Sequence, residues 1–162
     1  MCSNRDERFA CAAKYEAERS ELPMKHGCIA VQSGKIIARG YNSYRTASKD
    51  GMIIDSYTCH AEIDVLRKCI RQNITRKINV YIVRTSGNGE YRNAAPCAAC
   101  VNMLRRFKVH NIIYSTNDGK LQKCKLDNYN HHFISSGSKA MISNRIGQKH
   151  SGNCFIYKDL SI

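Results

Sequence analysis

Apolar residues follow two different spacings along the chain, one typical of helices and the other of strands. From Arg5 to about Arg19 they recur three to four positions apart, which predicts a first helix. The next segment, HGCIAVQSGKIIARGYN at residues 26–42, contains two apolar runs separated by Ser33-Gly34. Runs of this kind around a glycine-containing turn predict a β-hairpin.

The remaining pattern switches between helical and strand spacing several times. After a polar loop, two further segments have apolar residues at helical spacing, and each is followed by a short apolar run that predicts a buried strand. The second of these helices follows Pro96, a residue favoured at helix starts. The predicted elements are a loop at 43–58, a helix at 59–69, a strand at 78–84, a loop at 85–93, a helix at 97–107 and a strand at 111–116.

This order of elements predicts a three-layer α/β protein. Asp118-Gly119 separates the strand at 111–116 from the strand-like run KLQKCKL, which predicts a hairpin and a fifth strand antiparallel to the fourth. No repeat or linker divides the chain, so one domain is expected over residues 1–162, with its motif-bearing core at about 25–126. Residues 127–162 have no clear pattern, and the segment FIYKDL within them fits either a strand or a short helix.

Composition narrows the class of protein. Apolar residues make up 43% of the 162 residues, enough for a compact domain with a core. No apolar run approaches the ~20 residues that span a bilayer, and the charged N-terminus does not resemble a secretory signal. Nine cysteines, an odd number at irregular spacing, argue against a complete disulfide framework. We expect an intracellular protein, cytoplasmic or nuclear, that is neither secreted nor bound to a membrane.

Positive charge is concentrated in the middle of the chain. The net charge is +13, and residues 65–112 contain ten lysines and arginines but only one acid, Glu90. Such an excess favours anionic partners, including nucleotides and nucleic acids. A basic surface with no specific partner would have the same composition, so charge alone does not decide between these readings.

Two of the predicted helices begin with residue types that bind metals. One begins with CHAE at 59–62, and the other begins within PCAAC at 96–100. Cys97 and Cys100 are three positions apart, which brings both thiolates to one face of a first helical turn. Together with His60 they would provide three protein ligands. A zinc ion with three protein ligands keeps its fourth position open for water, as in catalytic sites.

Glu62 adds a proton acceptor to these potential ligands. It follows His60 by two positions, about 200° around a helix, so it need not bind the metal itself. A carboxylate near the metal can take a proton from the activated water and deliver it again. The sequence therefore places Glu62 as the candidate catalytic residue.

Each motif has other readings when it is taken alone. H-x-E at a helix start is more often structural, and CxxC also occurs in redox pairs and structural zinc sites. A structural zinc would need a fourth protein ligand, for which the candidates are Cys59, Cys124 and His131-His132. Cys59 is poorly placed for this role because it adjoins His60.

The combination of motifs is more specific than its parts. HAE at 60–62, PCAAC at 96–100 and GYN at 40–42 resemble the cytidine and deoxycytidylate deaminase superfamily, over about residues 25–116. The resemblance implies one zinc ion per chain, a five-stranded mixed sheet with both motif helices on one face, and a homo-oligomer. It also assigns roles: zinc ligands His60, Cys97 and Cys100, proton shuttle Glu62, and substrate contact Asn42. The free N–H groups of a first helical turn add the backbone N–H of Ala61 as a donor to the base.

The motifs do not name the substrate. We favour hydrolytic deamination of a cytosine nucleoside or nucleotide, namely CMP, dCMP or cytidine, to the uracil product and ammonia. The alternative is a deaminase that edits nucleic acid, either adenosine in tRNA or cytidine in single-stranded DNA or RNA. HAEI resembles the tRNA-editing enzymes, and the charge of +13 suits a polyanion. A relative that keeps zinc only as a structural element is a third reading, and the intact Glu62 argues against it.

Cues within the resemblance point to different branches of the superfamily. KHGCIAV, GKIIARGYN and TCHAE resemble the deoxycytidylate branch. An antiparallel fifth strand resembles the free-nucleoside branch, whereas deoxycytidylate enzymes and nucleic-acid editors usually have a parallel one. Free-nucleoside enzymes usually carry a glutamate after the position of Asn42, where this chain has Ser43. Arg45, Lys25 and His26 are candidates for contacting a phosphate instead.

Overall fold

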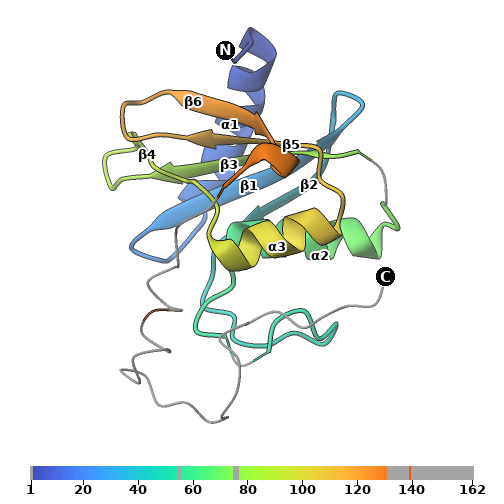
Figure 1. Cartoon of the computed structure of the whole chain (residues 1–162). Coiled ribbons are helices and arrows are strands. Elements are labelled where there is room, and N and C mark those ends of the chain that lie inside the picture. The colour runs from blue at the N-terminus through green and yellow to red at the C-terminus, as the bar shows by residue number, and fades with distance from the viewer. Residues whose placement is uncertain (1, 55, 75–76, 131–138, 140–162) are drawn as a thin grey trace.

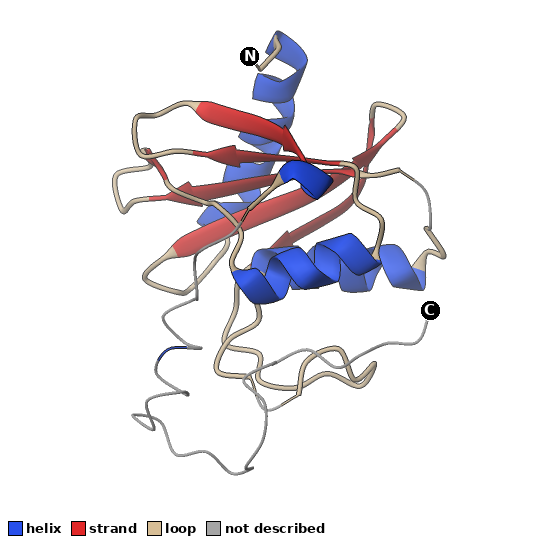
Figure 2. Ribbon diagram, viewed as in Figure 1, coloured by secondary structure: helices blue, strands red, loops and turns tan. Residues whose placement is uncertain are grey.

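The computed structural model describes residues 2–54, 56–74, 77–130 and 139, and these form three layers. One sheet lies in the middle, with helix α1 (Asn4–Glu18) on one face and α2 (Ala61–Arg71) and α3 (Ala98–Arg106) on the other (Figure 1 and Figure 2). The predicted three-layer α/β/α arrangement is confirmed, with both motif helices on one face. The segment FIYKDL lies outside the described residues. Within the described ranges, no helix is long and apolar enough to cross a membrane.

The sheet is mixed. Its strands are β1 (Lys25–Gln32), β2 (Lys35–Tyr41), β3 (Asn79–Thr85), β4 (Tyr91–Arg92), β5 (Asn111–Ser115) and β6 (Leu121–Lys125). The order across the sheet is β2-β1-β3-β5-β6, and β4 pairs with β3. β3 and β5 are parallel, and the other pairs are antiparallel. This is the predicted five-stranded sheet, extended by the short β4 in the segment predicted as a loop at 85–93.

The last two strands form the predicted hairpin. Gly119 in the turn has a φ of +76°, which glycine adopts without steric cost. Residues of β5 and β6 pair in antiparallel register, from Ser115 opposite Leu121 to Asn111 opposite Lys125. A 3-10 turn, η1 (Leu126–Asn128), follows β6 and lies beside α3. The direction of the fifth long strand is therefore antiparallel, as the turn residues predict.

The two motif helices start slightly later than their apolar spacing predicts. His60 and Cys97 are the N-cap residues of α2 and α3, each with an extended backbone at a φ of −74°. An N-cap residue is the last residue before the backbone takes helical dihedral angles, and its side chain turns back toward the third helical residue. Cys100 is that third residue in α3. The N-cap position therefore directs the Cys97 side chain toward Cys100.

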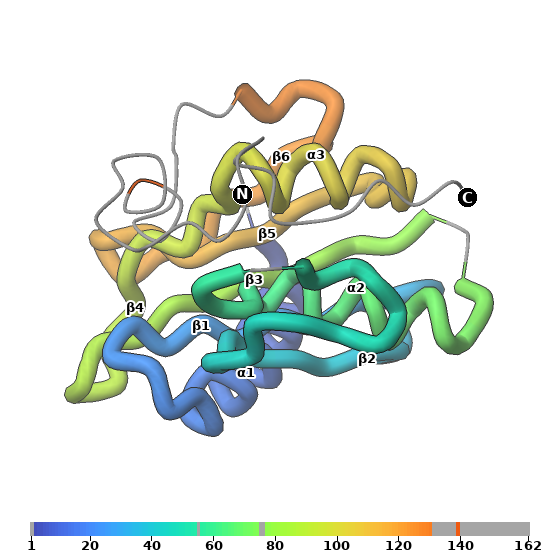
Figure 3. Tube along the Cα trace, turned by 90° about the horizontal axis from the view of Figure 1, so that it is seen from below, coloured from blue at the N-terminus to red at the C-terminus, as the bar shows by residue number. Residues whose placement is uncertain are grey.

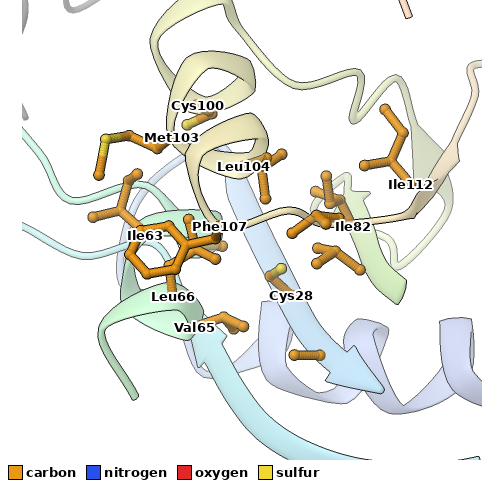
Figure 4. Close-up of a cluster of buried hydrophobic side chains, with 14 of the residues drawn as sticks. Cys28, Ile63, Val65, Leu66, Ile82, Cys100, Met103, Leu104, Phe107 and Ile112 are labelled. Atoms are coloured by element: carbon orange, nitrogen blue, oxygen red, sulfur yellow. The ribbon is translucent and has the colours of Figure 1, made fainter. Parts of the chain in front are cut away.

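Alternate residues of the central strands face different helices. Cys28 and Ile82 belong to the buried cluster shared with α2 and α3, which Figure 4 shows, whereas Ile29 and Tyr81 belong to the cluster under α1. Helix α1 crosses β1 closely at Gly27, where a Cβ atom would lie 1.9 Å from a backbone carbonyl oxygen of α1. Glycine at this position allows the helix to pack directly on the strand.

Asp6 links α1 to the sheet. Its carboxylate accepts hydrogen bonds from the Tyr81 hydroxyl on β3 at 2.8 Å and from Nζ of Lys123 on β6 at 3.1 Å. It also closes the capping box of α1 with Ser3, whose backbone N–H donates at 3.0 Å. Burial by itself would raise the pKa of Asp6, but these hydrogen bonds lower it to about 2.

Acid is expected to destabilise the protein through Asp6. The folded-state pKa of about 2 lies below the unfolded value of about 3.9, so this stabilisation is present above about pH 4 and disappears as the pH falls toward 2. The loss should be about 1–2 kcal/mol of unfolding free energy. Urea unfolding of the metal-free protein at pH 6 and pH 2.5 measures it. Asp6→Asn should lose less stability over this range than the wild type and than the exposed control Asp127→Asn; an equal loss in all three would contradict the assignment.

Candidate active site

Three potential metal ligands meet where α2 and α3 begin. Nδ1 of His60 lies 3.2 Å from Sγ of Cys100 and 3.6 Å from Sγ of Cys97. All three donor atoms lie within 4.8 Å of one another. Figure 3 shows from a second direction that the two helices lie side by side, which brings their first residues together. We call these three residues the triad.

The triad has the dimensions of a zinc site. Tetrahedral zinc with bonds of about 2.1 Å to nitrogen and about 2.3 Å to sulfur separates these ligands by about 3.6 Å. The two nitrogen–sulfur distances, 3.2 and 3.6 Å, are close to that edge. One imidazole and two sulfurs are also ligand types that zinc prefers. The triad is therefore positioned to bind one metal ion.

The cysteines of the triad differ in their readiness to bind a cation. Hydrogen bonding to Cys100, helped by interactions with His60, lowers the pKa of Cys97 to about 4 although burial opposes this shift. Cys97 is therefore a thiolate at neutral pH. Burial raises the pKa of Cys100 well above its ordinary value, so this thiol would release its proton when a metal binds.

The protein supplies three potential ligands within the part of the chain that the structure describes. No fourth histidine, cysteine or acid joins the triad there. Cys59 is buried, and its thiol points to the carbonyl oxygen of His60 at 3.4 Å. Cys124 lies on β6 opposite Ile112, and His131-His132 falls outside the described residues. Three ligands leave room for a water molecule, as catalytic zinc requires.

Glu62 lies beside the triad without belonging to it. The residue is 5% exposed and sits in the first turn of α2. Burial raises the pKa of its carboxyl group, and the charges of His60 and Cys97 also act on it. A carboxyl group that is buried next to a metal site and has a raised pKa is suited to accept and return a proton.

Comparison with known families identifies this arrangement. The family model of the cytidine and deoxycytidylate deaminase zinc-binding region matches residues 3–116. The chain belongs to this family. The match includes both motif helices and the whole triad, so the predicted resemblance and the zinc cofactor are confirmed.

Solved structures of deaminases have a similar fold. The cytidine deaminase from Burkholderia pseudomallei is 19% identical, with a TM-score of 0.58, over 78% of this chain and 95% of that chain. The dCMP deaminase from the cyanophage S-TIM5 in apo form is 21% identical, with a TM-score of 0.54, over 70% of this chain and 84% of that chain. The same phage enzyme in complex with dCMP and dUMP gives a TM-score of 0.52 at 21% identity, over 70% of this chain and 82% of that chain. Comparison with curated proteins finds no match.

Asn42, the predicted substrate contact of this deaminase-family chain, holds the start of β1. Its Oδ1 accepts a hydrogen bond from the backbone N–H of His26 at 2.8 Å, and its Nδ2 donates to the carbonyl oxygen of Met24 at 2.7 Å. The side chain is buried. In this structure Asn42 shapes the backbone next to the site, and its contact with a substrate stays a prediction.

Strand register separates two of the predicted phosphate contacts. Lys25 pairs with Thr85 and lies two residues before Gly27 on β1. Both residues therefore point to the same face of the sheet, the face that carries α1. His26 faces the opposite side, and its pKa responds to the charges of both His60 and Cys97. Register therefore favours His26 over Lys25 as a neighbour of the triad.

Arg45 lies on the loop that joins β2 to α2. The ends of this loop are held together because Ser43 and Cys59 form an isolated β-bridge. Asp50 fixes its middle by an ion pair of 2.7 Å with Nε of the buried Arg67 on α2. Arg45 itself is exposed. The loop thus starts and ends next to the triad, and a role for Arg45 in substrate binding stays a prediction.

Tyr129 lies near the site although the sequence gives no signal for it. Its hydroxyl donates to the carbonyl oxygen of Pro96 at 3.3 Å, one residue before Cys97 of the triad. Its ring packs edge-on against Tyr114 at 6.0 Å. Burial raises the pKa of Tyr129 to about 12, and the charges of Cys97 and Glu62 add to this shift. Tyr129 follows the η1 turn in a segment without periodicity, so only the folded chain brings it here.

Proposed function

We propose that the protein catalyses zinc-dependent hydrolytic deamination of a cytosine nucleoside or nucleotide, giving the uracil product and ammonia. The observation that carries this proposal is the buried carboxyl group of Glu62 beside a triad with three protein ligands. A structural zinc site would need neither an open fourth position nor an adjacent proton acceptor.

Each residue of the site has a separate role in the proposed deamination. Zinc, when bound, supplies a water molecule whose pKa falls to about 7. His60, Cys97 and Cys100 hold the ion in our proposal. Glu62 takes a proton from the attacking water and delivers it to N3 of the cytosine ring. The oxygen of this water bonds to C4, Glu62 transfers the second proton of the water to the exocyclic amine, and the C4–N bond breaks to release ammonia.

The start of α2 supplies a further contact in this proposal. Ala61 is the first residue of α2 and is fully buried. The N–H groups of a first helical turn have no partner within the helix, so the N–H of Ala61 can donate to an oxygen of the base. This donor orients the ring toward Glu62, one residue further along.

The strand direction of β6 and the net charge of the chain favour different substrates. The antiparallel β6 supports a free nucleoside, because the resemblance associates a parallel strand at this position with both nucleic-acid editors and deoxycytidylate enzymes. The net charge of +13 suits a nucleotide as well as a nucleic acid. We therefore propose cytidine, CMP or dCMP as the substrate. Assembly into a homo-oligomer stays a prediction that sedimentation can test.

A substrate panel tests the proposal. Zinc-loaded protein is incubated separately with cytidine, deoxycytidine, CMP, dCMP, a cytosine-containing single-stranded oligonucleotide and tRNA, and the products are separated chromatographically. We expect uracil products and equimolar ammonia from at least one free nucleoside or nucleotide. Deamination of the oligonucleotide or tRNA alone, with binding that weakens steeply as salt rises, would replace the proposal with nucleic-acid editing.

A further inference from the structure

Arg84, near the end of β3, has a buried nitrogen that lacks a hydrogen-bond partner. Among the described residues, its Nε is the buried side-chain polar atom left unsatisfied. Its Nη2 lies 3.3 Å from Sδ of Met24, and a thioether sulfur is only a weak acceptor. A guanidinium group has five N–H donors, so most of its binding capacity at this position is unused. Buried donors of this kind favour a ligand that accepts hydrogen bonds.

Strand register places Arg84 on the same side of the sheet as the triad. His26 on β1 and Arg92 on β4 are its direct partners across two antiparallel pairs, so the three side chains form a row on one face. Ile82 lies two residues earlier on β3 and packs in the cluster shared with α2 and α3. Because side chains alternate along a strand, the row points to the face that carries these helices.

The row also lies near the metal ligands. The chain runs from Arg92 to Cys97 in five residues, and His26 is close enough to the triad for the charges of His60 and Cys97 to act on it. The row is therefore a candidate neighbour for the sugar and any attached group of a substrate whose base lies at the triad.

Only one member of the row offers an uncommitted positive charge. His26 is neutral at pH 7, because burial lowers its pKa to about 4. Arg92 already forms an ion pair of 3.3 Å with Glu90. Arg84 has no carboxylate partner among the described residues. One available cation suits one phosphate group, whereas a nucleic-acid strand is usually bound along a longer positive groove.

Ser115 fixes the backbone of both arginines. Its Oγ accepts a hydrogen bond from the backbone N–H of Arg84 at 3.1 Å and donates to the carbonyl oxygen of Arg92 at 2.7 Å. Ser115 is itself fully buried on β5. The guanidinium group is thus attached to a rigid part of the sheet, which reduces the entropic cost of binding a ligand.

We propose that Arg84 binds the 5′-phosphate of a mononucleotide whose cytosine ring lies at the triad, with Arg92 beside it, so that CMP or dCMP is bound in preference to the nucleoside. This inference rests on the proposed deaminase function. The planar guanidinium group pairs two of its N–H donors with two phosphate oxygens. The antiparallel β6 resembles the free-nucleoside branch, so the preference for a phosphate group rests on Arg84 and its surroundings.

Product binding tests this role separately from turnover. UMP and uridine are titrated calorimetrically into the zinc-loaded Glu62→Gln protein with and without Arg84→Met, which keeps most of the aliphatic stem. We expect UMP to bind more tightly than uridine, and Arg84→Met to reduce this ratio of affinities by about 10–100-fold, as for loss of a charged hydrogen-bonding pair. Arg84→Lys keeps the positive charge but lacks the planar pair of N–H donors, so it should give an intermediate ratio of UMP to uridine affinities. Arg8→Met removes an exposed charge from α1 and should keep the original ratio.

The outcomes separate the inference from the function. An unchanged ratio, or an equal loss of affinity for UMP and uridine, would overturn the role of Arg84. Arg84→Met that weakens binding of a single-stranded oligonucleotide but leaves the ratio of UMP to uridine affinities unchanged would overturn it too. That result would show that Arg84 binds a phosphodiester group of nucleic acid instead. Thermal unfolding confirms that each variant is folded, and Arg84→Lys provides the same ratio test if Arg84→Met does not fold. Failure of the substrate panel would contradict deamination without altering the binding result.

Discussion

Replacing Glu62 with glutamine is expected to stop turnover while leaving one zinc ion bound per chain. Glutamine has nearly the same shape as glutamate but cannot accept and return the proton that the reaction moves. A positioned acid–base group contributes about 10²–10⁴-fold to a rate, so kcat should fall by at least this factor. Steady-state assays with the substrate identified in the panel measure the rate, and elemental analysis after gel filtration measures the zinc.

A matched variant at another glutamate shows whether the loss of turnover is specific to Glu62. Glu18→Gln changes an exposed residue of α1, on the other face of the sheet, and should keep both the rate and the zinc. Loss of zinc from Glu62→Gln would show that Glu62 is a ligand. Retention of the wild-type rate would assign the proton transfer to another residue.

Replacing Cys100 with serine is expected to remove zinc and activity together. A serine hydroxyl is a poor zinc ligand, and only two ligands of the triad remain. Loss of a residue that only supports a metal ligand typically weakens metal binding by about 10–100-fold. Loss of Cys100 should weaken zinc binding by more than this. Zinc that binds only the folded state stabilises it by about 4 kcal/mol at a concentration 1,000 times its Kd. Chelation should therefore lower the unfolding temperature of the wild type and leave that of Cys100→Ser unchanged.

The neighbouring cysteine provides the control for this experiment. Cys59 adjoins His60 and is buried, but its thiol points away to a backbone carbonyl. Cys59→Ser should keep one zinc ion per chain. Loss of zinc from Cys59→Ser, or full zinc in Cys100→Ser, would contradict the assignment of the triad.

Local signals in the sequence predict much of this molecule because their causes are local. Apolar spacing predicts each helix and long strand, and Asp118-Gly119 predicts the antiparallel hairpin that the structure contains. The sequence predicts a loop where the structure has β4, because a two-residue strand is too short to show alternation. The sequence also predicts too early a start for both motif helices, because an N-cap residue differs from a helical one in backbone dihedrals rather than in composition.

The candidate site is predictable where one short segment carries the chemistry. H-A-E and P-C-x-x-C contain the candidate ligands and Glu62, and the spacing of the cysteines reflects a single helical turn. Contacts between segments carry no such local mark. Asn42 binds the backbone of Met24 and His26, which lie sixteen or more residues earlier in the chain. Tyr129 reaches the carbonyl of Pro96 from beyond the last strand, where the sequence shows no periodicity.

Short segments of the sequence predict the fold class, the types of the candidate ligands and the candidate proton shuttle, because each depends on residues close together in the chain. Which side chains surround them depends on how distant segments come together in the folded chain. Strand register turns Lys25 toward α1 and His26 toward the triad, and it places Arg84 between His26 and Arg92. Register is a relation between distant segments, and a shift by one residue would exchange the two faces of a strand. For this reason the metal centre is visible in the sequence, whereas the proposed phosphate contact emerges only from the folded sheet.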